Sequence, residues 1–68
     1  MSNFMLELVL NEVIQAGESR SMLDVDVSLA RIFPMCVTFG DTKSDIHAAL
    51  IDCALDRNVS ACFKNSLL

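Results

Sequence analysis

The sequence has no tryptophan, no tyrosine, one proline and only two glycines among its 68 residues. So few chain-breaking residues, with a hydrophobic share of 53%, exclude a disordered or linker-like chain. Long apolar runs are missing as well, because Glu7, Asn11 and Glu12 interrupt the best candidate for a membrane-spanning helix, which needs roughly 18 residues. We therefore expect a folded protein without a membrane partner.

Positive charge is scarce. Five Lys and Arg residues are scattered against nine Asp and Glu residues, which gives a net charge of −4. Nucleic-acid affinity depends on clustered cations that neutralise phosphates, so this balance predicts no nucleic-acid partner. No basic segment precedes the apolar stretch that begins near residue 4, so we expect no secretory signal. Cys36, Cys53 and Cys62 are an odd number without close pairs, which indicates reduced thiols and a cytoplasmic location.

Groups that could carry catalysis or hold a metal are also sparse. His47 and Cys53 lie six residues apart in a predicted helix, where their side chains diverge by roughly 120°. The cysteines and the histidine contain no pair at the short spacing that zinc sites use. Asp45, Asp52 and Asp56 share one face of that helix, which we interpret as a solvated strip. The sequence predicts no enzyme, no cofactor and no metal site.

The first predicted helix covers residues 3–16, with Ser2 or Asn3 as the N-cap and Gly17 as the residue that ends it. Its polar residues fall on one line at spacing four, and its apolar residues cover an arc of roughly 180°. The line is Glu7, Asn11 and Gln15, and the arc is Met5, Leu6, Val9, Leu10, Val13 and Ile14. That arc is wider than one neighbouring element needs.

The second predicted helix runs from Asp45 to about Arg57, with Ser44 as its N-cap and Asn58 as the residue that closes it. Apart from the aspartate strip, nearly all of its residues are apolar or small, which is typical of a buried helix. Residues 59–65 are expected to add one or two helical turns before the apolar end of the chain.

The segment between these helices, residues 22–39, favours a β-hairpin. Apolar and polar residues alternate over residues 23–30, and this period of two is typical of a half-buried strand. A second strand is expected over residues 31–39, with Pro34 at an edge or bulge because proline cannot donate to a ladder. One face of that strand carries Phe33, Met35, Val37 and Phe39.

A helix is the alternative for the same segment. Ser21 and Asp24 resemble a capping box, and Val25 would share a face with later apolar residues. We prefer the strands, because a helix would place Leu23 and Val27 on its polar side. The predicted fold is therefore one α+β domain over residues 1–68, with a helix, a two-stranded β-hairpin, a helix and a short C-terminal helix; an all-α small helical bundle is the alternative.

The apolar surface of these elements exceeds what one small core can bury, so we expect an interface. Twofold self-association is the simplest solution, because one patch then covers itself. Without Trp and Tyr, the anchors are expected to be Met and Phe together with aliphatic residues. The predicted interface residues are Met5, Val9, Val13, Phe33, Met35, Phe39, Ile51, Leu55, Phe63, Leu67 and Leu68.

These patterns together predict a non-enzymatic protein–protein interaction module. We expect a homodimeric small regulator or assembly factor, whose partner is a second copy of itself, a larger protein, or both. One alternative is a small acidic inhibitor of the phage or plasmid type, which would bind and block a larger protein. A second alternative is a thiol-dependent redox sensor that uses the three cysteines.

Overall fold

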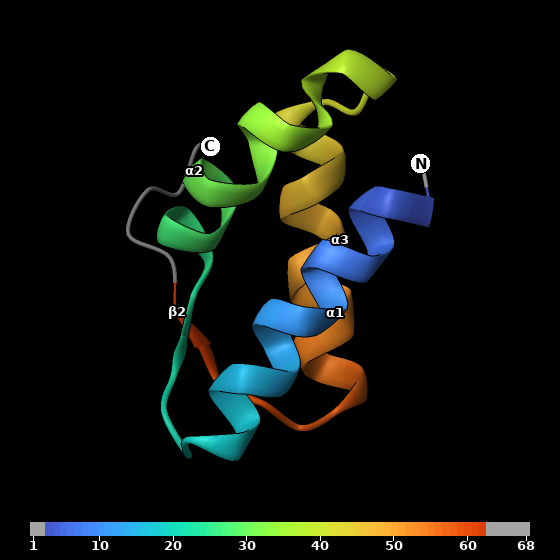
Figure 1. Ribbon diagram of the computed structural model, residues 1–68. Coiled ribbons are helices and arrows are strands. Elements are labelled where there is room, and N and C mark those ends of the chain that lie inside the picture. The colour runs from blue at the N-terminus through green and yellow to red at the C-terminus, as the bar shows by residue number, and fades with distance from the viewer. Residues whose placement is uncertain (1–2, 63–68) are drawn as a thin grey trace.

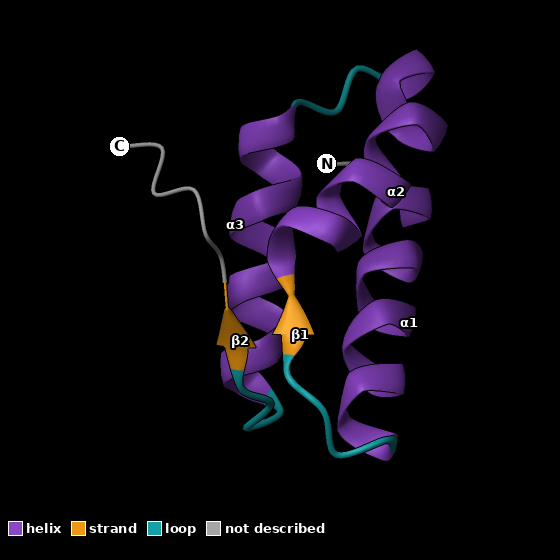
Figure 2. Cartoon of the chain, turned by 90° about the vertical axis from the view of Figure 1, so that its left-hand side faces the viewer, coloured by secondary structure: helices purple, strands orange, loops and turns teal. Residues whose placement is uncertain are grey.

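Three helices pack against one another, and two short strands lie beside them (Figures 1 and 2). The computed structural model describes residues 3–62. The elements are α1 (Asn3–Glu18), β1 (Leu23–Asp24), α2 (Val25–Cys36), the 3-10 helix η1 (Val37–Phe39), α3 (Lys43–Asp56) and β2 (Ala61–Cys62). None of the described helices has the length and hydropathy that crossing a bilayer requires. The domain is mostly helical, with one small sheet.

The sheet is a pair of parallel strands formed by residues far apart in the sequence. Leu23 of β1 lies opposite Ala61 of β2, and Asp24 lies opposite Cys62. The pairing is parallel because α1 and α3 run side by side in the same direction, and each turns back into one of the strands (Figure 1). The fold therefore repeats one unit, a helix followed by a tight turn and a strand.

The turns after α1 and α3 have the same hydrogen bonds. The backbone N–H of Ser21 donates to the carbonyl of Ala16 at 3.0 Å, and the N–H of Val59 donates to the carbonyl of Ala54 at 2.8 Å. A second, shorter-range backbone bond closes each turn, between Arg20 and Gly17 after α1 and between the equivalent residues after α3. This pair of bonds defines the Schellman motif, which satisfies carbonyls at the end of a helix.

Each turn places one residue in the left-handed region of backbone conformation. These residues are Arg20, with φ of 55°, and Asn58, with φ of 57°. The prediction that Asn58 closes the second helix is confirmed. The prediction that Gly17 ends the first helix is wrong, because Gly17 lies inside α1. Its small size has a different use, since a Cβ atom there would meet Cγ2 of Val59 at 3.2 Å.

The core lies where the three helices face one another. Its buried apolar residues are Met5, Val9, Val13, Leu23, Val25, Ile32, Cys36, Ile46, Ala49, Leu50 and Ala54. The two predicted polar lines are confirmed as exposed to solvent; they are Glu7, Asn11 and Gln15 on α1 and Asp45, Asp52 and Asp56 on α3. Each of these helices therefore turns one polar line away from the core, as its sequence indicates.

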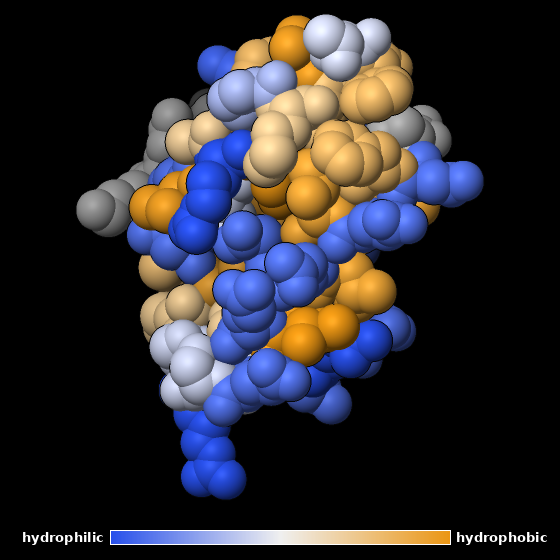
Figure 3. Space-filling view, in the orientation of Figure 1, coloured by the Kyte–Doolittle hydropathy of each residue, from blue (hydrophilic) through white to orange (hydrophobic). Residues whose placement is uncertain are grey.

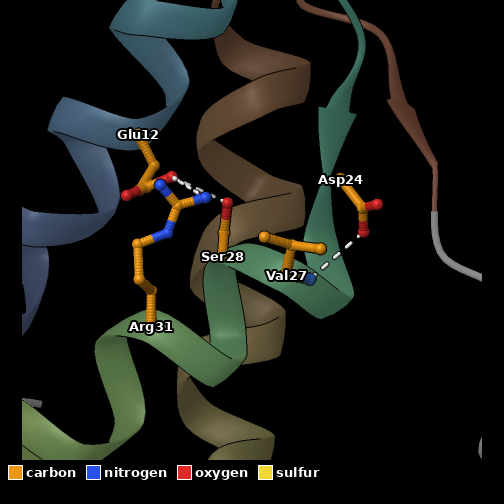
Figure 4. A network of polar contacts seen from close by, with 5 residues as sticks. All are labelled: Glu12, Asp24, Val27, Ser28 and Arg31. Atoms are coloured by element: carbon orange, nitrogen blue, oxygen red, sulfur yellow. Dashed lines mark hydrogen bonds and ion pairs between the residues drawn. The ribbon is translucent and has the colours of Figure 1, made fainter.

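Residues 22–39 do not form the predicted β-hairpin. They contain the two residues of β1, then α2 and η1. Asp24 is the N-cap of α2, because its carboxylate accepts a hydrogen bond from the N–H of Val27 at 3.1 Å (Figure 4). Leu23, which argued against a helix, precedes it in β1, and Val27 is 49% exposed on the surface of α2.

Two residues explain why the alternating pattern misled the prediction. Ser28 is polar but only 2% exposed, and it lies on the inward face of α2. It can be buried there because its hydroxyl donates a hydrogen bond to the carboxylate of Glu12 in α1. Pro34 lies inside α2, within its last turn. Its ring removes the hydrogen bond to the carbonyl of Ala30, and Ala30 is exposed, so water can hydrate that carbonyl.

The ends of the second predicted helix also differ from the prediction in part. Its N-cap is Thr42 and not Ser44, because the Thr42 hydroxyl accepts a hydrogen bond from the N–H of Asp45 at 3.1 Å. The helical turns predicted for residues 59–65 are absent from the described part of that segment, residues 59–62, which leads into β2. The remainder of that prediction, and Ser2 as a cap, lie outside the described residues.

Candidate interaction surfaces

The structure places three of the predicted interface residues in the core. Met5, Val9 and Val13 are buried on the face of α1 that meets the other helices, so they present almost no surface to a second chain in this fold. The prediction took them from the middle of the apolar arc of α1. A helix that packs against two neighbours buries the middle of its arc and exposes the edges.

Other predicted interface residues do reach the surface. Met35, Phe39 and Leu55 are exposed, and Leu55 is the most exposed of the large apolar residues in the described chain, at 70%. Phe33 and Ile51 are half-buried. The remaining three predicted residues, Phe63, Leu67 and Leu68, lie outside the described residues.

Exposed apolar side chains lie on η1, at the end of α2 and at the start of α1. We call Phe4, Met35, Val37 and Phe39 the aromatic end, and their exposed fractions lie between 40% and 59%. The ring centroids of Phe4 and Phe39 are 5.4 Å apart with planes tilted by 50°, a favourable geometry for an aromatic pair. Figure 3 shows apolar surface gathered over this end of the molecule. The aromatic end thus takes exposed apolar side chains from three elements, α1, α2 and η1, and its two phenylalanines are in contact.

A positive charge lies over Phe33, the ring at the end of α2. Nζ of Lys43, the first residue of α3, lies 5.2 Å from the ring centroid of Phe33 on α2. This is within the distance of a cation–π contact, which attracts an ammonium group to the face of an aromatic ring. The contact ties the start of α3 to the end of α2, on either side of η1.

A second apolar surface is a hollow between α1 and α3, which we call the α1–α3 groove. Its volume is about 490 Å³, within the range of roughly 300–1,000 Å³ typical of binding clefts. It is lined by Leu6, Val9, Leu10, Ala49, Asp52, Cys53 and Asp56. The small side chains of Ala49 and Cys53 leave it open, and the exposed carboxylates of Asp52 and Asp56 stand one helical turn apart along it.

A polar contact joins α1 to α2 (Figure 4). Oγ of Ser28 donates to Oε1 of Glu12 at 2.9 Å, and Nη2 of Arg31 lies 3.8 Å from the same oxygen. The Glu12 side chain is 18% exposed, whereas that of Arg31 is 58% exposed. Because the Ser28 hydroxyl is buried and donates to a carboxylate, we interpret this contact as structural and not catalytic.

The environment of Cys36 does not activate its thiol. Burial raises the pKa of Cys36 above its ordinary value, and the neighbouring carboxylate of Asp41 raises that pKa further. A raised pKa lowers the thiolate fraction, so Cys36 is a poor nucleophile. Cys53 and Cys62 are half-buried, and all three cysteines are free thiols. Within residues 3–62, no group of three or more His, Cys, Asp and Glu side chains is placed to hold a metal ion.

Several exposed apolar residues are missing from the predicted interface. They are Phe4, Leu6, Leu10, Met22, Val27 and Val37. Leu6 and Leu10 belong to the predicted apolar arc of α1, at the edge nearest α3. The width of that arc was the signal that could have identified them, because only its middle fits against the core.

Two apolar surfaces, the aromatic end and the α1–α3 groove, are therefore the candidate functional features of the described chain. One contains the Phe4–Phe39 pair, and the other is an aliphatic hollow beside two aspartates. Comparisons of this chain with models of protein families, with curated proteins and with solved structures give no match.

Proposed function

We propose that this protein is a non-enzymatic protein–protein interaction module that forms a homodimer through its aromatic end. The observation that carries the proposal is the exposure of four large apolar side chains together: Phe4, Met35, Val37 and Phe39. Apolar surface in water is unfavourable by about 25 cal/mol per Å². A contiguous apolar patch on a small domain is typical of an interaction site.

A second copy of the chain is a suitable occupant of this surface. Twofold symmetry allows one patch to cover itself, so no further protein is needed. The net charge of −4 makes two copies repel one another over most of their surfaces. None of the four residues of the aromatic end is charged, so two copies can meet there without placing carboxylates against each other.

The proposed role is that of a small regulator or assembly factor, which acts by binding protein partners through its apolar surfaces. Three free thiols fit a reducing compartment such as the cytoplasm. The redox-sensor alternative has less support, because the raised pKa of Cys36 opposes thiolate formation. The acidic-inhibitor alternative is favoured by one specific observation, the pair of aspartates beside the α1–α3 groove.

Light scattering coupled to size-exclusion chromatography tests the homodimer. We expect the wild-type chain, of 7.5 kDa, to elute at micromolar concentrations with twice that mass. The double variant Met35→Ser/Phe39→Ser should weaken the dimer by about tenfold or more, because large apolar anchors dominate interfaces. Val27→Ser removes an exposed apolar side chain from α2 outside the aromatic end, so it should leave the mass unchanged.

Circular dichroism should show the same helical signal for both variants, which confirms that both fold. A wild-type chain that remains a monomer at all micromolar concentrations would overturn the homodimer. Equal loss of the dimer in Val27→Ser would show that the aromatic end is not the interface.

A further inference from the structure

We infer that the α1–α3 groove is a docking site for a basic amphipathic helix of another protein. This goes beyond the homodimer, because it assigns a partner to a different surface. The inference follows from the shape of the groove, from the charge beside it and from the absence of a suitable occupant among the described helices of this chain.

The shape of the groove suits a helix. α1 and α3 lie side by side (Figures 1 and 2). Residues of both helices line the groove. Leu6 and Leu10 are one turn apart on α1, and Ala49 and Cys53 are one turn apart on α3. An incoming helix places apolar side chains at the same one-turn spacing, so two or more of them can enter the hollow together.

The charge of the groove selects the partner. Among the described residues that line it, Asp52 and Asp56 are the charged ones, and both belong to α3. A helix that places Lys or Arg beside its apolar stripe would bring those cations next to the two carboxylates. Exposed pairs of this kind add little affinity each, but they set the orientation of the helix and reject acidic helices.

The described helices of a second copy do not have the required chemistry. Within the described residues α1 contains no Lys or Arg, α2 contains only Arg31, and α3 contains only Lys43. Arg31 lies beside the carboxylate of Glu12, and Lys43 lies over the ring of Phe33. Self-docking in the groove would instead bring the aspartates against a molecule of net charge −4. The groove therefore fits a different, basic protein.

The test uses two synthetic peptides of about four helical turns. One has leucines on one face and lysines elsewhere, and the other has glutamates in place of the lysines. Fluorescence anisotropy with the full chain should show binding of the lysine peptide, with an affinity that falls as salt is added. The glutamate peptide should bind at least about tenfold more weakly.

Variants locate the binding. Asp52→Asn/Asp56→Asn should lower the affinity for the lysine peptide by about fivefold to tenfold, the combined effect expected for two exposed charge pairs. Glu7→Gln/Glu18→Gln removes two exposed carboxylates of α1 outside the groove lining, so it should change the affinity by less than about twofold. Cys53→Met fills the groove without changing charge, and it should also weaken binding.

The same titration on Met35→Ser/Phe39→Ser separates this inference from the homodimer. We expect an unchanged peptide affinity in that variant, whether or not the wild-type chain is a dimer. Failure of both peptides to bind, equal loss in the two charge variants, or equal affinity for both peptides would each overturn the inference. A further outcome would overturn the inference. If Leu10→Ser dissociated the dimer while Met35→Ser/Phe39→Ser left it intact, a second copy of the chain would be the occupant of the groove.

Discussion

α1 and α3 have the same backbone plan and different surfaces. Each ends in a Schellman turn with one left-handed residue, and each leads into one strand of the parallel pair. At the groove between them, α1 presents Leu6 and Leu10, whereas α3 presents Asp52 and Asp56. One repeated backbone unit therefore forms a groove with an aliphatic side and an acidic side.

The two helices also differ in how they hold α2. Glu12 of α1 accepts a hydrogen bond from the buried Ser28, whereas Lys43 of α3 contacts the ring of Phe33. The contact of α1 with α2 includes a partly buried carboxylate, which fixes one relative position of the two helices. The carboxylates of α3 near the groove are exposed to solvent, so they are available to a partner.

The largest expected effect tests whether the two helices contribute equally to the core. Met5 of α1 and Leu50 of α3 are both fully buried. Met5→Ala and Leu50→Ala should each lower the free energy of unfolding by about 3 kcal/mol, through lost burial and the cavity left behind. Urea denaturation followed by circular dichroism measures this.

The control for these variants is Leu55→Ala on the outer side of α3. Because Leu55 is 70% exposed, its truncation should change the free energy of unfolding by less than about 0.5 kcal/mol. If Leu55→Ala destabilised the monomer as much as Leu50→Ala does, the burial of α3 described above would be wrong. A small effect of Met5→Ala alone would show that the first turn of α1 contributes less than α3.

A smaller effect is expected at the contact between α1 and α2. Ser28→Ala removes the hydroxyl donor to the Glu12 carboxylate, and it should lower the free energy of unfolding by about 1 kcal/mol. Ser44→Ala removes an exposed hydroxyl of α3 and should change that free energy by less than about 0.5 kcal/mol. Equal values for the two variants in urea denaturation would contradict a structural role for the Ser28–Glu12 bond.

Sequence periodicity predicted α1 and α3 well, because both helices have a continuous polar line opposite their buried face. It failed for α2, where the polar Ser28 is buried by virtue of a partner on another element. The pairing of β1 with β2 was also beyond prediction. It joins residues far apart in the chain, and each strand is only two residues long.

The candidate surfaces were predictable only in part. Met35 and Phe39 were predicted as interface residues from one face of a strand that does not form, and both are exposed. The groove could not be predicted, because it depends on α1 and α3 lying side by side. The wide apolar arc of α1 indicated a surplus of apolar surface without locating it.

The smallest expected effect concerns the two left-handed residues. Arginine is strained at positive φ, whereas asparagine tolerates it, and glycine adopts it freely. Arg20→Gly should therefore raise the free energy of unfolding by about 0.5–1 kcal/mol, and Asn58→Gly should raise it by less than about 0.5 kcal/mol. Ser21→Gly is the control: its φ is not positive, so added freedom in the unfolded chain should destabilise the protein. Equal gains in thermal denaturation at Arg20 and Asn58 would show that residue type does not distinguish the two turns, and that α1 and α3 differ only in their surfaces.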